Sequence, residues 1–257
     1  MREKLAVQLY TLRKECQQHF PEVLRTLANR GWAGVQFAGF HDYDPRELAS
    51  VLNETGLKAA GLHVGFDQIA NKLDQIVVEA ELLQTKDIIC PSVHPSMRTE
   101  SGYRQIKRTL QDAAVHLRER GFRISYHNHA YEFDTTVDGR NALDFMLNPD
   151  EDNPILAEID VYWIRKVGFD PAAYIETYTG RMPIIHLKDM TNDDGQSYAE
   201  IGTGCIDFKP ILQWGERSGV EWYVVEQDVC PRDAMDCVDT SYTNIMRLLS
   251  ELEVHTK

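Results

Sequence analysis

The chain has 257 residues, 43% of them hydrophobic, and a formal net charge of −13. Nucleic acids and anionic membranes are bound through clustered Lys and Arg, so this charge argues against both partners and leaves small polar molecules as compatible ones. No stretch approaches the ~18 apolar residues of a membrane span, and no signal-peptide core follows residues 1–4, so we expect a cytoplasmic protein.

Strand-like and helix-like segments alternate along the whole chain. The apolar runs that predict strands lie at residues 5–10, 33–37, 58–63, 87–90, 122–129, 155–160, 183–188 and 221–228. The segments with helical spacing lie at residues 16–30, 45–52, 67–84, 101–120, 141–148, 171–179, 207–218 and 239–253. Eight such units favour a single α/β domain over residues 1–257, a closed (β/α)8 TIM barrel, with a polar loop at 190–206 that could cover a site. No GxGxxG motif follows the first strand, which argues against a dinucleotide cofactor.

Two histidines share one face of the fifth predicted strand. Phe122, Ile124 and Tyr126 alternate with a polar set that includes His127 and His129, which is the period-two pattern of a strand. The apolar set can pack against helices while the histidines point into the barrel. An interior is a costly place for two imidazoles unless something binds them.

The same alternation directs polar side chains inward at other strand ends. They are Gln8, Gln36 and His63 in the first three strands, and Glu158, Asp160, His186, Lys188, Glu226 and Asp228 in the last three. Converging carboxylates and imidazoles repel or desolvate one another unless a cation neutralises them. Mixed nitrogen and oxygen donors suit Mn²⁺, Zn²⁺, Co²⁺ or Fe²⁺ better than Ca²⁺. The five cysteines form no CxxC pair, so no thiolate zinc site is indicated.

Some of these residues also have structural interpretations. A single histidine such as His63 is more often a hydrogen-bonded core or rim residue than a ligand, and Glu158 could be a salt-bridged barrel residue. Glu132 lies in the loop after the fifth strand and could reach substrate or only solvent. The remaining histidines are expected to be structural or surface residues: His19, His41, His94, His116 and His255.

Short motifs at the strand ends carry a family resemblance. They are VQLY at 7–10, YHNH at 126–129 with EF at 132–133, EID at 158–160 with Trp163, HLKD at 186–189, GTG at 202–204 with DF at 207–208, and VEQD at 225–228. Each motif is weak alone. In this order and spacing they resemble the sugar phosphate isomerase/epimerase family, which has a xylose isomerase-like barrel and includes ketose 3-epimerases and inosose dehydratases.

The resemblance implies a site for one divalent metal, with Mn²⁺ as the leading candidate and Zn²⁺, Co²⁺, Fe²⁺ or Mg²⁺ also compatible. The family site takes a Glu, an Asp, a His and a second Glu from strands five to eight. Asp160, His186 and Glu226 match the last three positions, whereas His127 stands at the first. This departure resembles the inosose dehydratase branch. Glu158 or a water could then complete the ligand set.

The resemblance also implies the activity. We expect a metal-dependent isomerase or epimerase acting on a sugar, keto-sugar or cyclitol through an enediolate intermediate. A lyase that dehydrates a keto-sugar or inosose at the same metal site is the alternative that His127 favours, and a non-catalytic sugar-binding protein on a decayed barrel is another. The candidate acid–base residues are Glu226, His129, Glu132 and Lys188, and the candidate substrate contacts are Gln8, Gln36, His63 and Trp163. The expected partner is a small carbohydrate, and such barrels often form homo-oligomers.

Overall fold

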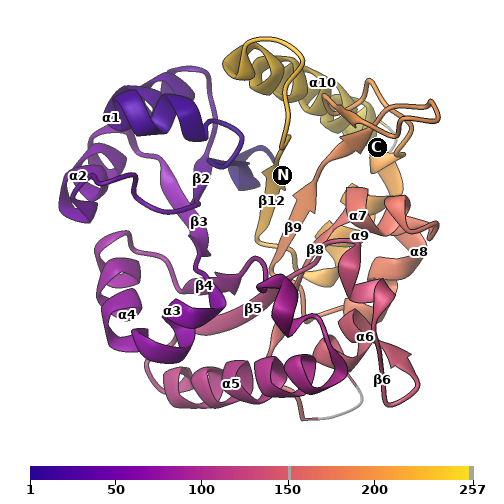
Figure 1. The fold of residues 1–257 in the computed structure, drawn as a ribbon. Helices are drawn as coiled ribbons and strands as arrows, with labels where there is room; N and C mark the ends of the chain where they lie inside the picture. Colours follow the sequence, from indigo (N-terminus) through magenta and orange to yellow (C-terminus); the bar gives the residue numbers. More distant parts are fainter. Residues whose placement is uncertain (150–151, 255–257) are drawn as a thin grey trace.

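Eight parallel strands form a closed barrel in the computed structural model, which describes residues 1–149 and 152–254. The barrel strands are β1 (Leu5–Gln8), β2 (Gly34–Phe37), β3 (Lys58–His63), β4 (Asp87–Cys90), β5 (Arg123–His127), β8 (Leu156–Asp160), β9 (Ile184–Leu187) and β12 (Trp222–Val225). The ring closes where β1 pairs with β12, with Leu5 opposite Tyr223 (Figure 1). The predicted (β/α)8 barrel is therefore confirmed.

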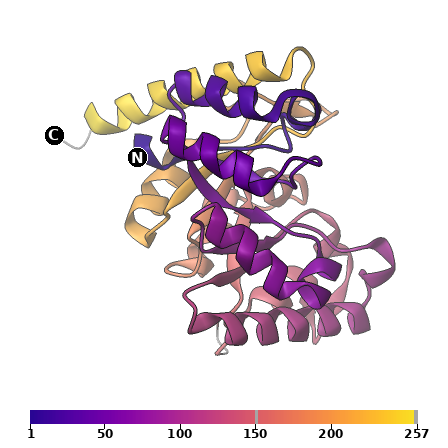
Figure 2. The same cartoon turned by 90° about the vertical axis from the view of Figure 1, so that its left-hand side faces the viewer.

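Helices surround the barrel. They are α1 (Arg13–Asn29), α2 (Pro45–Thr55), α3 (Phe66–Asn71), α4 (Leu73–Leu82), α5 (Glu100–Arg118), α6 (Ala142–Leu147), α7 (Val161–Lys166), α8 (Pro171–Ile175), α9 (Phe208–Ser218) and α10 (Ala234–Val254). Figure 2 shows the helices of the first half of the chain lying along the outside of the barrel. The last helix, α10, packs near the end of α1, where the rings of Trp32 and Tyr242 have centroids 4.9 Å apart. Within the described residues, none of the helices is long and apolar enough to span a membrane.

Local sequence signals set the ends of α2. The Asp44 side chain accepts the N–H of Arg46, and Pro45 occupies the first helical position, where its missing N–H costs nothing. Gly56 ends the helix in the left-handed conformation with φ of 77°, which glycine adopts without steric cost. Caps of this kind explain why helix starts and stops are readable from sequence.

Several elements differ from those predicted. The helix expected over 67–84 divides into α3 and α4 at Lys72, whose φ of −135° is not helical. The loop expected over 190–206 contains a short hairpin, formed by β10 (Asp189–Met190) and β11 (Tyr198–Ala199). The other additions are a hairpin of β6 (Thr136–Val137) and β7 (Arg140–Asn141), the helix α7, and the 3-10 turns η1 (Arg2–Lys4), η2 (Pro95–Met97), η3 (Tyr131–Asp134) and η4 (Glu176–Tyr178).

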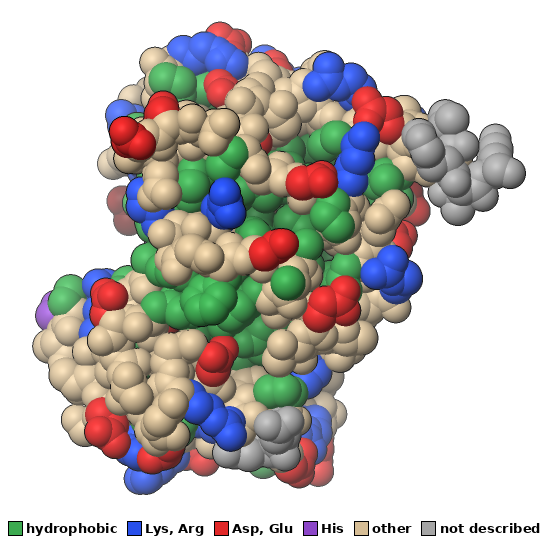
Figure 3. All heavy atoms as spheres, turned by 90° about the vertical axis from the view of Figure 1, so that its right-hand side faces the viewer, with side chains coloured by type: hydrophobic (Ala, Val, Ile, Leu, Met, Phe, Trp, Pro, Cys, Tyr) green, Lys and Arg blue, Asp and Glu red, His purple; other side chains and the backbone are tan. Residues whose placement is uncertain are grey.

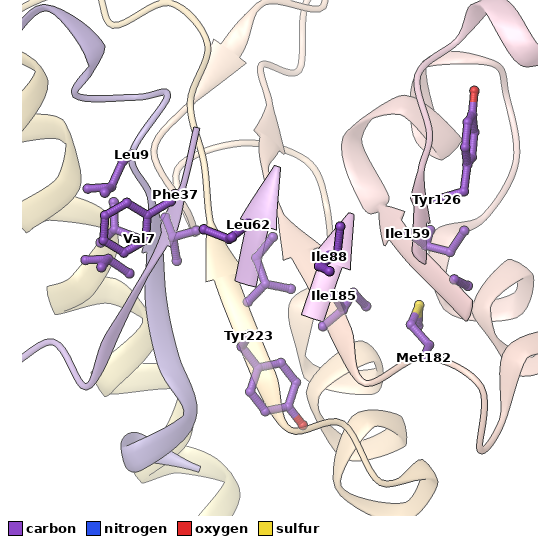
Figure 4. Packing of buried hydrophobic residues seen from close by; sticks show 14 of the residues in the cluster. Val7, Leu9, Phe37, Leu62, Ile88, Tyr126, Ile159, Met182, Ile185 and Tyr223 are labelled. Carbon is purple, nitrogen blue, oxygen red and sulfur yellow. The ribbon is translucent and has the colours of Figure 1, made fainter. Parts of the chain in front are cut away.

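The side chains of the barrel strands form three groups. Those that point outward pack against the helices; Figure 4 shows Val7, Phe37, Leu62, Ile88, Ile159 and Ile185 among them. Those that point inward at the amino-terminal end of the barrel are apolar, and form a separate cluster of Ala6, Ala60, Ile89, Ile184 and Val224. Further along the same strands the inward side chains become polar, so the barrel interior changes from apolar to polar toward the carboxyl ends of the strands.

Surface features complete the fold. His19, His94 and His116 are exposed and His41 packs on Phe20, in line with structural or surface positions, whereas His255 lies outside the described residues. On the side of the molecule where α6 and α8 lie, hydrophobic side chains gather across the middle of the surface (Figure 3). Exposed apolar patches often mark contact surfaces between proteins. The patch is compatible with a homo-oligomer, which stays a prediction.

Candidate metal centre and active site

A cavity of about 410 Å³ opens at the carboxyl ends of the barrel strands. Its lining includes most of the ionisable side chains expected at these strand ends, among them His63, His127, His129, Lys188, Glu226 and Asp228. In TIM barrels this end carries the catalytic residues, whereas the amino-terminal end serves stability. A second cavity of about 500 Å³ lies at that other end, beside Asp87 and Glu221. Both of these carboxylates are bound by Arg123, at 2.6 Å each, so they have a structural partner already.

Four residues from four strands form a group that could hold a metal ion. His127 ends β5, Asp160 ends β8, His186 lies in β9 and Glu226 follows β12. Their ligand atoms all lie within 4.8 Å of one another. His186 Nδ1 is 3.1 Å from Glu226 Oε2, and His127 Nε2 is 3.9 Å from Asp160 Oδ2. Two imidazole nitrogens and two carboxylate oxygens fit a first-row divalent cation such as Mn²⁺ or Zn²⁺, so the expected ligand set comes together here.

Glu158 lies one layer deeper, fully buried, and is surrounded by nitrogen atoms. Its Oε1 lies 2.7 Å from His63 Nε2, 3.1 Å from His127 Nδ1 and 3.1 Å from His186 Nε2. Its Oε2 accepts a hydrogen bond of 2.6 Å from Gln36 Nε2. A second group that could hold an ion is therefore formed by His63, His127, Glu158 and His186. It shares His127 and His186 with the first group.

Lys188 brings a positive charge to the same end of the barrel. Its Nζ is 2.8 Å from Asp160 Oδ2, 2.9 Å from Glu226 Oε2 and 2.9 Å from Asp228 Oδ1, although the side chain is only 1% exposed. Burial opposes this charge, but the three carboxylates outweigh burial and raise the pKa of Lys188 well above its usual value. The three carboxylates therefore favour the ammonium form of Lys188.

The two histidine ligands carry opposite pKa shifts. Burial, helped by the charge of His186, lowers the pKa of His127 to about 3. Burial also opposes a charge on His186, but Glu158 and Glu226 raise its pKa to about 10. Burial raises the pKa of Asp160 to about 6 in spite of the attraction of Lys188. A metal ligand must be an unprotonated nitrogen, so metal binding at this group competes with the proton on His186.

Comparison with known proteins identifies the family. A model for xylose isomerase-like TIM barrels matches residues 24–234. The chain belongs to the xylose isomerase-like TIM barrel family. A curated relative, an inosose dehydratase from Geobacillus kaustophilus, is 24% identical over 250 residues, covering 82% of this chain and 80% of that protein. An inosose dehydratase from Lacticaseibacillus casei is 24% identical over 236 residues, covering 84% of this chain and 74% of that protein.

Solved structures share the fold. A sugar phosphate isomerase/epimerase from Parabacteroides distasonis has a TM-score of 0.79 at 19% identity, over 94% of this chain and 93% of that one. A probable 3-DHS dehydratase from Bacillus anthracis has a TM-score of 0.71 at 12% identity, over 95% of this chain and 98% of that one. The resemblance drawn from the strand-end motifs is thus confirmed for the family and for the barrel.

In this xylose isomerase-like barrel, the ring of Trp163 packs against His129. His129 lines the cavity, its ring stacks on Tyr131 with centroids 5.2 Å apart, and it lies 5.3 Å from the ring of Trp163. Its buried Nδ1 has no hydrogen-bond partner among the described residues, and burial lowers the pKa of the imidazole well below its usual value. Trp163 contacts His129 and Lys188 but is not among the residues that line the cavity. His129 is therefore a neutral imidazole with a free nitrogen.

Glu132 was expected to reach substrate or solvent from its loop, but the structure buries it completely. Its Oε1 accepts a hydrogen bond of 2.8 Å from the Tyr126 hydroxyl, and its Oε2 accepts one of 2.9 Å from the backbone N–H of His129. Glu132 therefore does not reach the cavity, and it holds the backbone of His129 in place. Its position was wrong because sequence gives the loop but not the direction of the side chain.

The buried Glu132 should make stability depend on pH. Burial raises the pKa of its carboxyl to about 7, against the lowering effect of the hydrogen bonds from Tyr126 and His129. Between a pH of about 4.5, where the unfolded chain loses this proton, and about 7, unfolding releases a proton, so stability falls as pH rises. We expect Glu132→Gln to flatten this part of the curve, measured by urea unfolding at a series of pH values. Parallel curves for the two proteins would contradict the raised pKa.

The residues expected to bond substrate hydroxyls lie at different depths. Gln8 and Gln36 are fully buried below the cavity, and Gln8 Nε2 lies 2.6 Å from Gln36 Oε1. Their amides serve the polar network around Glu158, so the structure does not place them against a substrate. His63, in contrast, lines the cavity. The lining residues without a predicted role are Tyr10, Ala38, Gly39, Gln68, Pro91, Ser92 and Asp228, of which Tyr10 belongs to the VQLY motif and Asp228 to the VEQD motif.

Proposed function

We propose that the protein is a metal-dependent lyase that removes water from a keto-sugar or inosose. The curated relatives that cover most of the chain are inosose dehydratases. The observation that carries the choice is that Glu226 is the one glutamate among the described residues that lines the cavity. The resemblance implies that an epimerase uses two glutamate ligands on opposite faces of the substrate carbon. Here the first of those positions holds His127, and Glu158 is buried beneath it.

The remaining acid and base lie side by side, which suits an elimination. Glu226 Oε2 and Lys188 Nζ are 2.9 Å apart on the same side of the cavity. In our proposal the Glu226 carboxylate takes the proton from the carbon next to the carbonyl. Lys188 donates a proton to the hydroxyl on the following carbon, the carbon–oxygen bond breaks, and water leaves as a carbon–carbon double bond forms.

The metal and the cavity serve the same step. A divalent cation held by His127, Asp160, His186 and Glu226 would polarise the substrate carbonyl and stabilise the negative charge of the enediolate. His63, Ser92 and Gln68 offer hydrogen-bonding groups to hydroxyls. A small polar substrate fits the acidic chain and a cavity of about 410 Å³.

A specific observation keeps isomerase or epimerase as the second candidate. His129 lines the same cavity as Glu226 and could serve as a second group that exchanges a proton with the substrate. Return of the proton from a second group, without loss of a hydroxyl, would give an isomer or epimer.

The deciding experiment follows a panel of inososes and keto-sugars by NMR in D₂O, with and without Mn²⁺. We expect metal-dependent formation of a product that lacks one water. Metal-dependent deuterium incorporation into an isomer, with no loss of water, would replace the lyase with an isomerase or epimerase. Tight ligand binding without exchange at any position would favour a sugar-binding protein.

A further inference from the structure

The buried Glu158 lies directly behind the two histidines of the metal centre. In the β5–β8 ladder Glu158 is the partner of His127, and in the β8–β9 ladder the partner of His186 is Asp160, two residues further along. The carboxylate is fully buried and does not line the cavity. Glu158 therefore contacts no substrate. It can influence the site only through the side chains that it contacts.

Hydrogen bonds around Glu158 fix the proton position on His186. The Nε2 of His186 lies 2.7 Å from Gln36 Oε1 and 3.1 Å from Glu158 Oε1. Gln36 Oε1 also accepts from Gln8 Nε2, and Gln36 Nε2 donates to Glu158 Oε2, which fixes the orientation of the Gln36 amide. Both atoms that face His186 Nε2 are thus acceptors, so this nitrogen must carry a proton. The other nitrogen, Nδ1, lies 3.1 Å from Glu226 Oε2, also an acceptor, and its proton is the one that a cation held by His186 and Glu226 would displace.

The same logic applies to His127 with the ring nitrogens exchanged. Its Nδ1 lies 3.1 Å from Glu158 Oε1, and a carboxylate oxygen can only accept, so Nδ1 carries the proton. Its Nε2 then holds the lone pair, on the side of Asp160. Glu158 thereby directs the opposite nitrogen of each ring, His127 Nε2 and His186 Nδ1, toward the carboxylates Asp160 and Glu226.

We propose that Glu158 is the positioning residue of the metal centre, which binds the Nδ1–H of His127 and the Nε2–H of His186 so that their opposite nitrogens face the cation. This inference rests on the metal site of the proposed function but not on the reaction. Ligand histidines commonly donate their second N–H to a carboxylate, which orients the ring and increases its basicity. A single carboxylate here serves two ligands on different strands.

The test is metal affinity, measured by titration with Mn²⁺ after chelator treatment. We expect Glu158→Gln to weaken Mn²⁺ binding by about 10–100-fold, because a neutral amide oxygen is a weaker acceptor than a carboxylate and the amide NH₂ group would face Gln36 Nε2, which is itself a donor. The visible spectrum of the Co²⁺-loaded protein should change as well, since the imidazoles lose their orientation. Gln36→Met removes the second acceptor of His186 Nε2–H and one donor to Glu158 Oε2, but it keeps the Glu158 carboxylate and should cause a smaller loss of affinity.

The control is Asp87→Asn, which removes a carboxylate that is 2% exposed and paired with Arg123 at the other end of the barrel. We expect it to lower stability and to leave Mn²⁺ affinity and the Co²⁺ spectrum unchanged. Parental affinity and spectrum in Glu158→Gln would overturn the proposal, as would an equal loss of affinity in Asp87→Asn. If Glu158→Gln does not fold, unchanged affinity in Gln36→Met overturns it.

Two further results separate this proposal from neighbouring ones. Loss of metal in His63→Ala as complete as in His186→Ala would place the ion in the deeper group with Glu158 as a ligand, and would overturn a positioning role. A parent protein that binds neither Mn²⁺ nor Co²⁺ would refute the metal site itself, and with it the proposed function.

Discussion

Asp160→Ala and His186→Ala proteins are each expected to bind Mn²⁺ more than about 100-fold more weakly than the parent, because loss of an outer partner of a ligand alone costs about 10–100-fold. Each residue supplies one of the four donor atoms that lie within 4.8 Å of one another. Without either donor the cation is held from fewer strands and has to compete with Lys188 for the carboxylates that remain. Metal content after purification and Mn²⁺ titration measure the effect.

Asp160 also begins a helix, so its replacement needs a matched control. Its carboxylate accepts the N–H of Tyr162 at 2.9 Å at the start of α7, and loss of such a cap costs about 0.5–2 kcal/mol. Asp170 accepts the N–H of Ala172 at 2.9 Å at the start of α8. Asp170→Ala should therefore lose a comparable cap and keep its metal. Full metal occupancy in both Asp160→Ala and His186→Ala would refute the ligand set.

The direction of the strand side chains could be predicted from sequence, but their depth could not. The alternation of β5 and β8 placed His127, Glu158 and Asp160 inside the barrel, and all three are buried there. Glu158 and Asp160 lie two residues apart, or ~6.6 Å along a strand. This spacing is enough for Asp160 to meet Lys188 and for Glu158 to be enclosed below. The depth of a side chain in the barrel is set by how far its strand extends past the neighbouring strands. This offset depends on the register of the whole barrel.

Loops and short helices were also beyond the sequence pattern. The helix α7 begins directly after Asp160, whose side chain is both a candidate ligand and the helix cap. No turn residues separate β8 from α7, so the sequence pattern does not mark where this helix starts. The loop after β9 is held by Asp189, which accepts N–H groups from Gly202, Gly204 and Ile206. Contacts between residues so far apart in sequence have no local signature. They nevertheless bring Tyr198, from this loop, to within 5.8 Å of Lys188.

Lys188→Met is expected to destabilise the metal-free protein by about 3–5 kcal/mol, the usual cost of removing one partner of a buried ion pair. The substitution keeps the length of the side chain but leaves Asp160, Glu226 and Asp228 without the ammonium that lies within 2.9 Å of each. A divalent cation attracts two of the same carboxylates. We therefore expect Mn²⁺ to restore part of the lost stability, and to stabilise Lys188→Met more than it stabilises the parent, in urea unfolding with EDTA or with Mn²⁺.

The matched control is Lys209→Met, which removes a lysine that lies 2.7 Å from Glu251 on the surface, where both side chains are more than 40% exposed (45% and 43%). An exposed pair contributes about 0–1 kcal/mol, so this variant should unfold almost as the parent does, and Mn²⁺ should stabilise both equally. Equal stabilisation of Lys188→Met and the parent by Mn²⁺ would mean that the ammonium and the cation do not share carboxylates. Lys188 would then be a structural counter-ion, remote from the metal, and its role as proton donor to a leaving hydroxyl would lose its geometric basis.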